Sequence, residues 1–145
     1  MFTVFIDGDQ GTTGLRVRER LAGREDITLL SLPEEKRKDL DARAAMARQA
    51  DATILCLPDA ASRELVAALG ESEGVILDAS TAHRTDPRFT YGFPELGAAQ
   101  AQAVKSARRI AVPGCHASGC LALVKPLGDA GLLSPDAPLS LLSLT

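Results

Sequence analysis

The chain has 145 residues, which is long enough for one domain with a hydrophobic core. Its 46% hydrophobic and 24% charged residues are ordinary for a globular protein, and a net charge of −3 gives no reason to expect nucleic acid or a membrane as a partner. No run approaches the roughly 18 apolar residues of a membrane span. Asp7 interrupts the first apolar run too early for a signal peptide, so we expect a cytoplasmic protein. The three cysteines have no metal-ligand spacing, so we expect neither a metal site nor a disulfide framework.

Short apolar runs alternate with helical patterns along most of the chain, and this alternation predicts a Rossmann-type doubly wound parallel sheet of the α/β class. In chain order we expect strands over residues 3–6, 27–31, 53–57, 75–77 and 110–112, and helices over residues 12–22, 40–50, 62–69 and onward from Cys115. The stretch 78–107 is the least regular and is expected to be a long functional loop with one helix. Pro126 is expected to kink or end the last helix.

Three glycines, Gly8, Gly11 and Gly14, follow the first expected strand and precede the first helix. Glycines permit a tight turn and a close approach of the backbone to a diphosphate, and the free N–H groups at the helix start, here at Thr12 and Thr13, attract anions. The G-x-x-G-x-x-G spacing differs from the usual dinucleotide pattern, so a purely structural turn is the alternative. We interpret the segment as the phosphate-binding turn of a dinucleotide site.

The second expected strand indicates which dinucleotide is bound. Folds specific for NAD usually carry an acidic residue there to hold the ribose hydroxyls. Here the strand ends at Ser31 and is followed by three consecutive cations, of which Arg37 and Lys38 are the last two. A hydroxyl and cations suit a 2′-phosphate, so we expect NADP(H), although a solvated charged loop is the alternative interpretation.

Cys115 follows a strand and a Pro-Gly pair, at the point where a helix is expected to begin. A helix N-terminus favours the thiolate, which is the nucleophilic form, and its N–H groups can bind the oxyanion formed when sulfur attacks a carbonyl. The alternative is a buried structural thiol. We expect Cys115 to be a catalytic nucleophile that forms a thioester. Cys56 and Cys120 lie in apolar runs, and we expect both in the core.

Four segments together resemble N-acetyl-γ-glutamyl-phosphate reductases, of the aspartate-semialdehyde dehydrogenase superfamily, and the short-chain type most of all. These segments are the glycine turn, Asp78-Ala79-Ser80-Thr81-Ala82-His83-Arg84, Tyr91-Gly92-Phe93-Pro94-Glu95, and Pro113-Gly114-Cys115 with the His-Ala-Ser-Gly that follows it. The long-chain type has Tyr where this chain has His116, and we assign His116 no catalytic role because a helix-start neighbour points away from the sulfur.

The resemblance implies NADPH-dependent reduction of N-acetyl-L-glutamyl 5-phosphate to N-acetyl-L-glutamate 5-semialdehyde, an arginine-biosynthesis step of the phosphorylating aldehyde dehydrogenase type. Cys115 would attack the acyl phosphate. Pro58 matches a segment beside the nicotinamide ribose, and Ser80 and Arg84 match a segment near the cofactor and the substrate phosphate. Hydrogen bonding within the loop is the alternative role for Ser80 and Arg84.

Members of this family are about twice as long, and the histidine that acts as their general acid/base lies beyond residue 145. We therefore expect residues 1–114 to form an NADP-binding domain, and residues 115–145 to form the nucleophile helix and the truncated start of an α+β substrate domain. Residues 139–145 resemble a strand. The chain alone is expected to bind NADP without reductase activity, and the full-length protein to be a homo-oligomer. Aspartate-semialdehyde dehydrogenase and a non-catalytic NADP-binding module are the alternatives.

Overall fold

A computed structural model describes residues 1–72 and 74–143. The strands are β1 (Phe2–Asp7), β2 (Ile27–Leu30), β3 (Ala52–Leu55), β4 (Val75–Asp78), β5 (Thr90–Tyr91) and β6 (Arg109–Ala111). The α-helices are α1 (Thr12–Leu21), α2 (Leu40–Gln49), α3 (Asp59–Leu69), α4 (Ala98–Ser106) and α5 (Cys115–Asp129), and the short 3-10 helices are η1 (Glu34–Lys36) and η2 (Pro94–Leu96).

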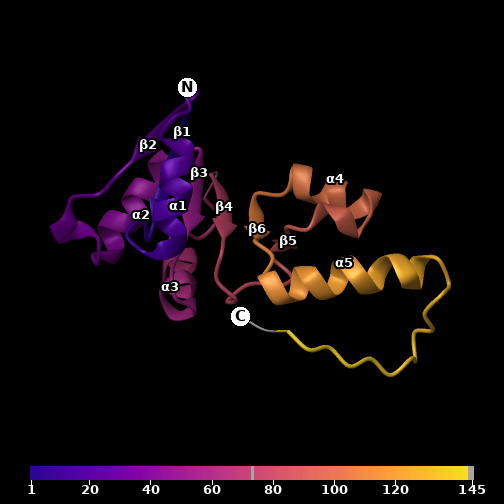
Figure 1. Cartoon of the computed structure of the whole chain (residues 1–145). Helices are drawn as coiled ribbons and strands as arrows, with labels where there is room; N and C mark the ends of the chain where they lie inside the picture. Colours follow the sequence, from indigo (N-terminus) through magenta and orange to yellow (C-terminus); the bar gives the residue numbers. More distant parts are fainter. Residues whose placement is uncertain (73, 144–145) are drawn as a thin grey trace.

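The strands form one sheet in the order β2-β1-β3-β4-β6-β5, and all neighbouring strands are parallel (Figure 1). The chain leaves β1 toward β2 and then returns to β3 on the other side of β1. The usual right-handed crossovers then place α1 on one face of the sheet and α2 on the other. The predicted doubly wound sheet is confirmed. Ligands of such sheets bind where the strand order reverses, which here is between the carboxyl ends of β1 and β3.

The core lies between the first four strands and the helices α2 and α3. Leu55 and Leu65 are fully buried and Ile76 is 2% exposed. These strands are continuous apolar runs because the sheet is covered on both faces. The core therefore holds the carboxyl ends of β1, β3 and β4 in fixed positions.

The C-terminal part differs from the expectation in three respects. Strand β5 was not foreseen and lies within the stretch predicted to be a loop. Helix α5 does not end at Pro126, one of the two predicted outcomes, but continues to Asp129. Residues 139–143 form no strand, and the predicted strand positions 144 and 145 lie outside the described residues.

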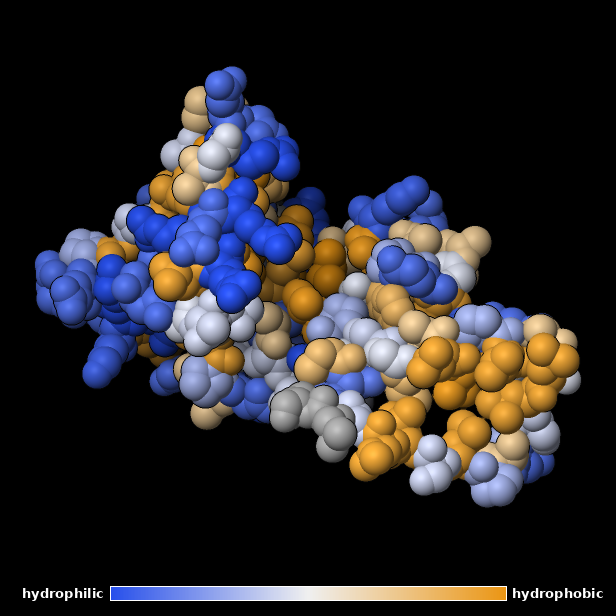
Figure 2. Space-filling model, in the orientation of Figure 1, coloured by the Kyte–Doolittle hydropathy of each residue, from blue (hydrophilic) through white to orange (hydrophobic). Residues whose placement is uncertain are grey.

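Helix α5 lies apart from α1, α2 and α3, and the segment after it runs back along the helix (Figure 1). None of its residues is fully buried. Figure 2 shows apolar side chains gathered over α5 and the segment that follows. The large exposed apolar residues there are Leu123, Leu127, Leu132, Leu139, Leu141 and Leu142. No helix among the described residues combines the length and apolar character that a membrane crossing requires.

Candidate nucleotide and cysteine site

The glycine turn joins β1 to α1 as predicted. Gly8 has φ of +87°, and a Cβ there would overlap the Cys56 carbonyl oxygen. A Cβ on Gly14 would overlap the carbonyl oxygen of Gly8. Gly11 caps α1, and its N–H donates to the Gly8 oxygen at 3.1 Å. Two of the three glycines are therefore required by close packing, and the third sits where the N–H groups of α1 are free.

One side of the turn opens into a hollow of about 190 Å³, called here the Ser31 hollow. Arg37, half-buried, lines it together with the exposed Ser31. Lys38 is exposed and is not among its lining residues. The remaining lining residues are Phe5, Ile6, Asp7, Gly8, Asp9, Gln10, Leu32 and Leu57. The structure thus brings Ser31 and Arg37 to the glycine turn, as the sequence predicted, and leaves Lys38 outside.

Two further hollows continue along the same edge of the sheet. The Thr12 hollow, of about 330 Å³, is lined by Gly11, Thr12, Thr13, Cys56, Leu57 and Ala79. The Cys115 hollow, of about 430 Å³, is lined by Thr13, Ala79, Arg84 and residues 112–117. Leu57 is common to the first two hollows, and Thr13 and Ala79 are common to the last two. One continuous surface therefore leads from Ser31 to Cys115.

Cys115 is the first residue of α5, and its side chain is exposed. Gly114 caps the helix, and its carbonyl oxygen accepts the Ser118 N–H at 2.9 Å. The prediction of a cysteine at a helix start is confirmed. His116 is exposed and hydrogen-bonds Ser143 through Nδ1.

Arg84 is half-buried beside the Cys115 turn. Its Nε donates to the Val112 carbonyl at 3.2 Å and its Nη2 donates to the Ala79 carbonyl at 3.3 Å. These two bonds hold the guanidinium between the ends of β4 and β6, while it still lines the Cys115 hollow. Arg84 can therefore fill both expected roles: it makes hydrogen bonds within the loop, and its guanidinium reaches the Cys115 hollow.

Ser80 and Pro58 are not among the residues that line the three hollows, although each directly follows one that is, Ala79 and Leu57 respectively. The Ser80 hydroxyl is buried, donates to Asp78 Oδ2 at 2.9 Å and accepts the Ala82 N–H at 3.1 Å. This arrangement is the alternative, loop-internal role for Ser80. Pro58 is exposed at the N-cap of α3.

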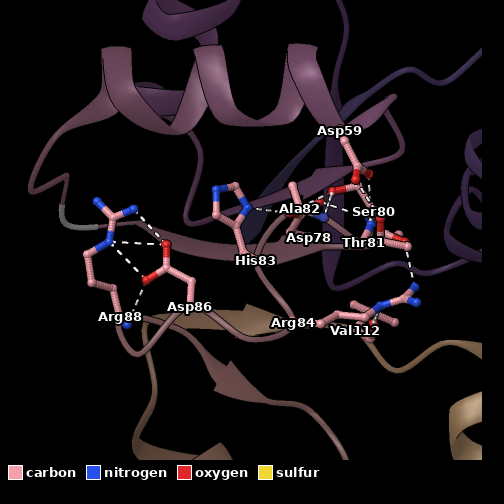
Figure 3. Close-up of polar contacts among 11 residues, drawn as sticks. Asp59, Asp78, Ser80, Thr81, Ala82, His83, Arg84, Asp86, Arg88 and Val112 are labelled. Atoms are coloured by element: carbon pink, nitrogen blue, oxygen red, sulfur yellow. Dashed lines mark hydrogen bonds and ion pairs between the residues drawn. The ribbon is translucent and has the colours of Figure 1, made fainter.

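Two buried pairs in the site were missed by the sequence interpretation. His83 Nδ1 lies 2.6 Å from Asp78 Oδ2, and the two side chains are 2% and 0% exposed (Figure 3). Arg43 of α2 donates to Asp7 Oδ2 at 2.8 Å, with side chains 6% and 7% exposed. Burial raises the pKa of Asp7, and the Arg43 guanidinium opposes that rise. The available signal was an aspartate at the end of each of two buried strands, since such a carboxylate needs a partner.

Two cysteine predictions are wrong. Cys56 is half-buried, because β3 ends at Leu55 and the next residue lines the Thr12 hollow. Burial raises the pKa of its thiol, and the nearby Asp7 and Asp78 carboxylates add to the rise. Cys120 is half-buried, because α5 packs against η2 without burying any of its own residues completely. Among the described residues no cluster of three or more His, Cys, Asp or Glu side chains could hold a metal ion.

A family described as semialdehyde dehydrogenase, NAD binding domain, matches residues 4–104. The chain belongs to this family. It is 51% identical over 138 residues to N-acetyl-gamma-glutamyl-phosphate reductase 2 of Pseudomonas putida, and 52% identical over 139 residues to the N-acetyl-gamma-glutamyl-phosphate reductase of Burkholderia lata. These alignments cover 95% and 96% of the chain, but only 44% of each relative. The resemblance seen in the sequence motifs is confirmed.

Solved semialdehyde dehydrogenase structures share the fold. Aspartate semialdehyde dehydrogenase from Francisella tularensis has a TM-score of 0.65 at 17% identity, over 90% of this chain and 42% of that protein. Aspartate semialdehyde dehydrogenase II from Vibrio cholerae, complexed with ASA, has a TM-score of 0.65 at 21% identity, over 90% of this chain and 47% of that protein. The family match identifies the chain as a nicotinamide-dinucleotide-binding unit of an oxidoreductase family.

Proposed function

We propose that this chain is the nucleotide-binding and nucleophile-bearing part of an NADPH-dependent N-acetyl-γ-glutamyl-phosphate reductase. The reaction is the reduction of N-acetyl-L-glutamyl 5-phosphate to N-acetyl-L-glutamate 5-semialdehyde. The observation that carries the proposal is the Cys115 hollow, because it joins an exposed thiol, the guanidinium of Arg84 and Thr13 of the glycine turn. The relatives at 51% and 52% identity bear the name of this reductase.

The cofactor fits the backbone of the first two hollows. The N–H groups of Thr12 and Thr13 at the start of α1 would hold the diphosphate beside Gly11, and Gly8 and Gly14 keep the turn tight. Pro58 would lie beside the nicotinamide ribose, and Ser80 would act through the loop that it stabilises. When bound, the nicotinamide would supply the hydride that reduces the thioester.

The preference for NADP(H) over NAD(H) rests on the Ser31 hollow. Two carboxylates line it, but Asp7 is paired with Arg43 and Asp9 is paired with Arg18. Each carboxylate therefore already has an arginine partner and is less available to a ribose diol. Arg37 therefore supplies a positive charge beside Ser31 where a 2′-phosphate would lie, and Lys38 would contribute only at longer range.

The chain's own residues account for the first half of the reaction. Cys115 Sγ attacks the acyl-phosphate carbonyl, and the N–H groups at the start of α5 stabilise the oxyanion. Arg84 holds the phosphate, which leaves as the thioester forms. We assign no proton transfer to His116, because its Nδ1 is engaged with Ser143. The general acid/base and most of the substrate pocket are expected outside these residues.

The proposal includes the division of the chain and its setting. Residues 1–114 form the NADP-binding domain, and residues 115–145 form the nucleophile helix and the beginning of the substrate domain. The complete protein is expected to be a cytoplasmic homo-oligomer that takes no nucleic acid and no membrane as partner. The 145-residue chain is expected to bind NADP without appreciable turnover.

A fluorescence titration tests the cofactor assignment. Arg37→Ala should weaken NADPH binding about 10- to 100-fold, the scale of a charge-assisted hydrogen bond, and leave NADH binding unchanged. Lys36→Ala is the matched control, because Lys36 is an exposed cation one residue away that does not line the hollow. Equal affinity of the unaltered chain for NADPH and NADH would overturn the 2′-phosphate argument.

Thiol labelling separates the reductase from a non-catalytic NADP-binding module. A nucleophilic Cys115 reacts with iodoacetamide much faster than Cys56 or Cys120 near neutral pH. In a non-catalytic module all three thiols react slowly. Aspartate-semialdehyde dehydrogenase, the alternative within the same chemistry, has a fold likeness at 17–21% identity in its favour, whereas the reductases are 51% and 52% identical to this chain.

A further inference from the structure

The carboxylate of Asp78 organises the loop that follows β4 (Figure 3). Its Oδ1 accepts the Ser80 N–H at 2.9 Å, and its Oδ2 accepts the Ser80 hydroxyl at 2.9 Å. The Ser80 hydroxyl oxygen in turn accepts the Ala82 N–H at 3.1 Å. The loop therefore wraps around one carboxylate that is completely buried.

His83 closes this loop. Its Nδ1 lies 2.6 Å from Asp78 Oδ2, and because a carboxylate oxygen only accepts, Nδ1 carries the proton. The imidazole also stacks on the Phe89 ring, with centroids 4.3 Å apart and 10° between the planes. Both contacts hold the ring in place and tie His83 to the end of β4.

The next residue in the chain is Arg84, and the same loop delivers its guanidinium to the Cys115 turn. The Asp78 carbonyl accepts the Val112 N–H at 2.8 Å, and Arg84 donates to the Val112 carbonyl. A Cβ on Gly114 would overlap the Arg84 guanidinium, which shows how closely the two segments pack. The buried Asp78–His83 pair thus lies directly before Arg84, in the loop that places the guanidinium beside Cys115.

We propose that Asp78 and His83 are positioning residues that act through Arg84: their buried hydrogen bond holds the loop so that the guanidinium lies in the Cys115 hollow and raises the reactivity of the thiol. The inference rests on the proposed role of Cys115 as the nucleophile. It assigns a function to two residues that line none of the three hollows.

The test measures the alkylation rate of each cysteine in the 145-residue chain with iodoacetamide at pH 7, by mass spectrometry of the labelled peptides. His83→Leu and His83→Asn introduce side chains with the same number of non-hydrogen atoms, but only the amide of His83→Asn can donate to Asp78. His83→Leu should slow Cys115 about tenfold, the scale expected when a cation moves away from a thiol, and His83→Asn should slow it less. In an Arg84→Met chain, which should itself be slow, neither His83 change should slow Cys115 further.

Ile76→Val controls for stability, because it trims the core of the same strand without touching the loop. It should lower the melting temperature and leave the Cys115 rate unchanged.

The inference is overturned if His83→Leu, like Ile76→Val, leaves the Cys115 alkylation rate unchanged. It is also overturned if the double variant His83→Leu with Arg84→Met is slower than Arg84→Met alone. If His83→Leu fails to fold, the same comparison of Cys115 rates is made with His83→Asn, alone and combined with Arg84→Met. If Cys115 of the unaltered chain is no faster than Cys120, the proposed nucleophile and this inference both fall. If Cys115 is fast and indifferent to His83, only the inference falls.

Discussion

The guanidinium group of Arg84 occupies the space that a side chain at Gly114 would need, so this arginine and the cap of α5 are packed without a gap. Gly114→Ala should therefore push the guanidinium aside at a small cost, about 1 kcal/mol of unfolding free energy or less, because the displaced group is the far end of a flexible side chain. Because the guanidinium must move, the alkylation of Cys115 should also slow. Gly119→Ala is the control in the same helix, since nothing lies within 4 Å of the added Cβ. It should gain about 0.5–1 kcal/mol from the better helix former. Urea unfolding and thiol labelling measure both effects, and an unchanged rate of Cys115 alkylation in Gly114→Ala would contradict the packing.

The turn at Gly8 should be equally intolerant. Gly8→Ala places a side chain at φ of +87° and against the Cys56 carbonyl, so we expect a loss of about 2–5 kcal/mol. NADPH binding should be lost under conditions in which the variant is still folded, because the turn must open to admit the methyl group. Gly23→Ala, with nothing within 4 Å, should leave binding unchanged. Circular dichroism followed by fluorescence titration separates the two effects. Wild-type NADPH affinity in Gly8→Ala would disprove the role of the turn.

Cys56 should report cofactor binding. Burial raises the pKa of its thiol, and a raised pKa leaves a smaller fraction of reactive thiolate at any given pH. Alkylation of Cys56 should therefore be slow at pH 7 and should increase only well above pH ~8.5, the ordinary pKa of cysteine. At pH 9 saturating NADPH should slow Cys56 about tenfold or more by covering the Thr12 hollow, and should leave Cys120 unaffected. Equal labelling of Cys56 with and without NADPH would place the cofactor elsewhere.

The Asp7–Arg43 pair should make stability depend on pH in a defined direction. Arg43→Met leaves the Asp7 carboxylate buried without its cation, at a cost of about 3–5 kcal/mol near neutral pH. The folded-state pKa of Asp7 is already raised, so its protonated form favours the folded chain, and without Arg43 the pKa rises further. The difference in melting temperature between the unaltered chain and Arg43→Met should therefore shrink as the pH falls from 7 toward 4. A difference that grows on acidification would contradict this account.

Sequence patterns predicted the features that depend on neighbouring residues. Gly8, Gly11 and Gly14 and the cysteine at the start of α5 act within one turn, so their spacing alone indicated their places. Strand β5 was missed because its two residues are too few to show a period. The strand expected over residues 139–145 is absent from the described positions 139–143, where no neighbouring strand offers hydrogen bonds.

The two buried pairs could not be predicted in the same way. Asp7 and Arg43 are 36 positions apart and meet only because α2 packs against β1. Asp78 and His83 are only five positions apart, but the loop that joins them has neither helical nor strand periodicity. Their meeting follows from the burial of the Asp78 carboxylate at the end of β4, which a linear pattern does not specify.

The strand order sets the distance between the glycine turn and the start of α5. The glycine turn follows β1 and α5 follows β6, and these strands are separated only by β3 and β4. At the usual spacing of hydrogen-bonded strands, their ends are about 14 Å apart. Backbone hydrogen bonds between the strands set this separation. Loops on either side can therefore lengthen or shorten during evolution without changing the distance between the glycine turn and Cys115 at the start of α5.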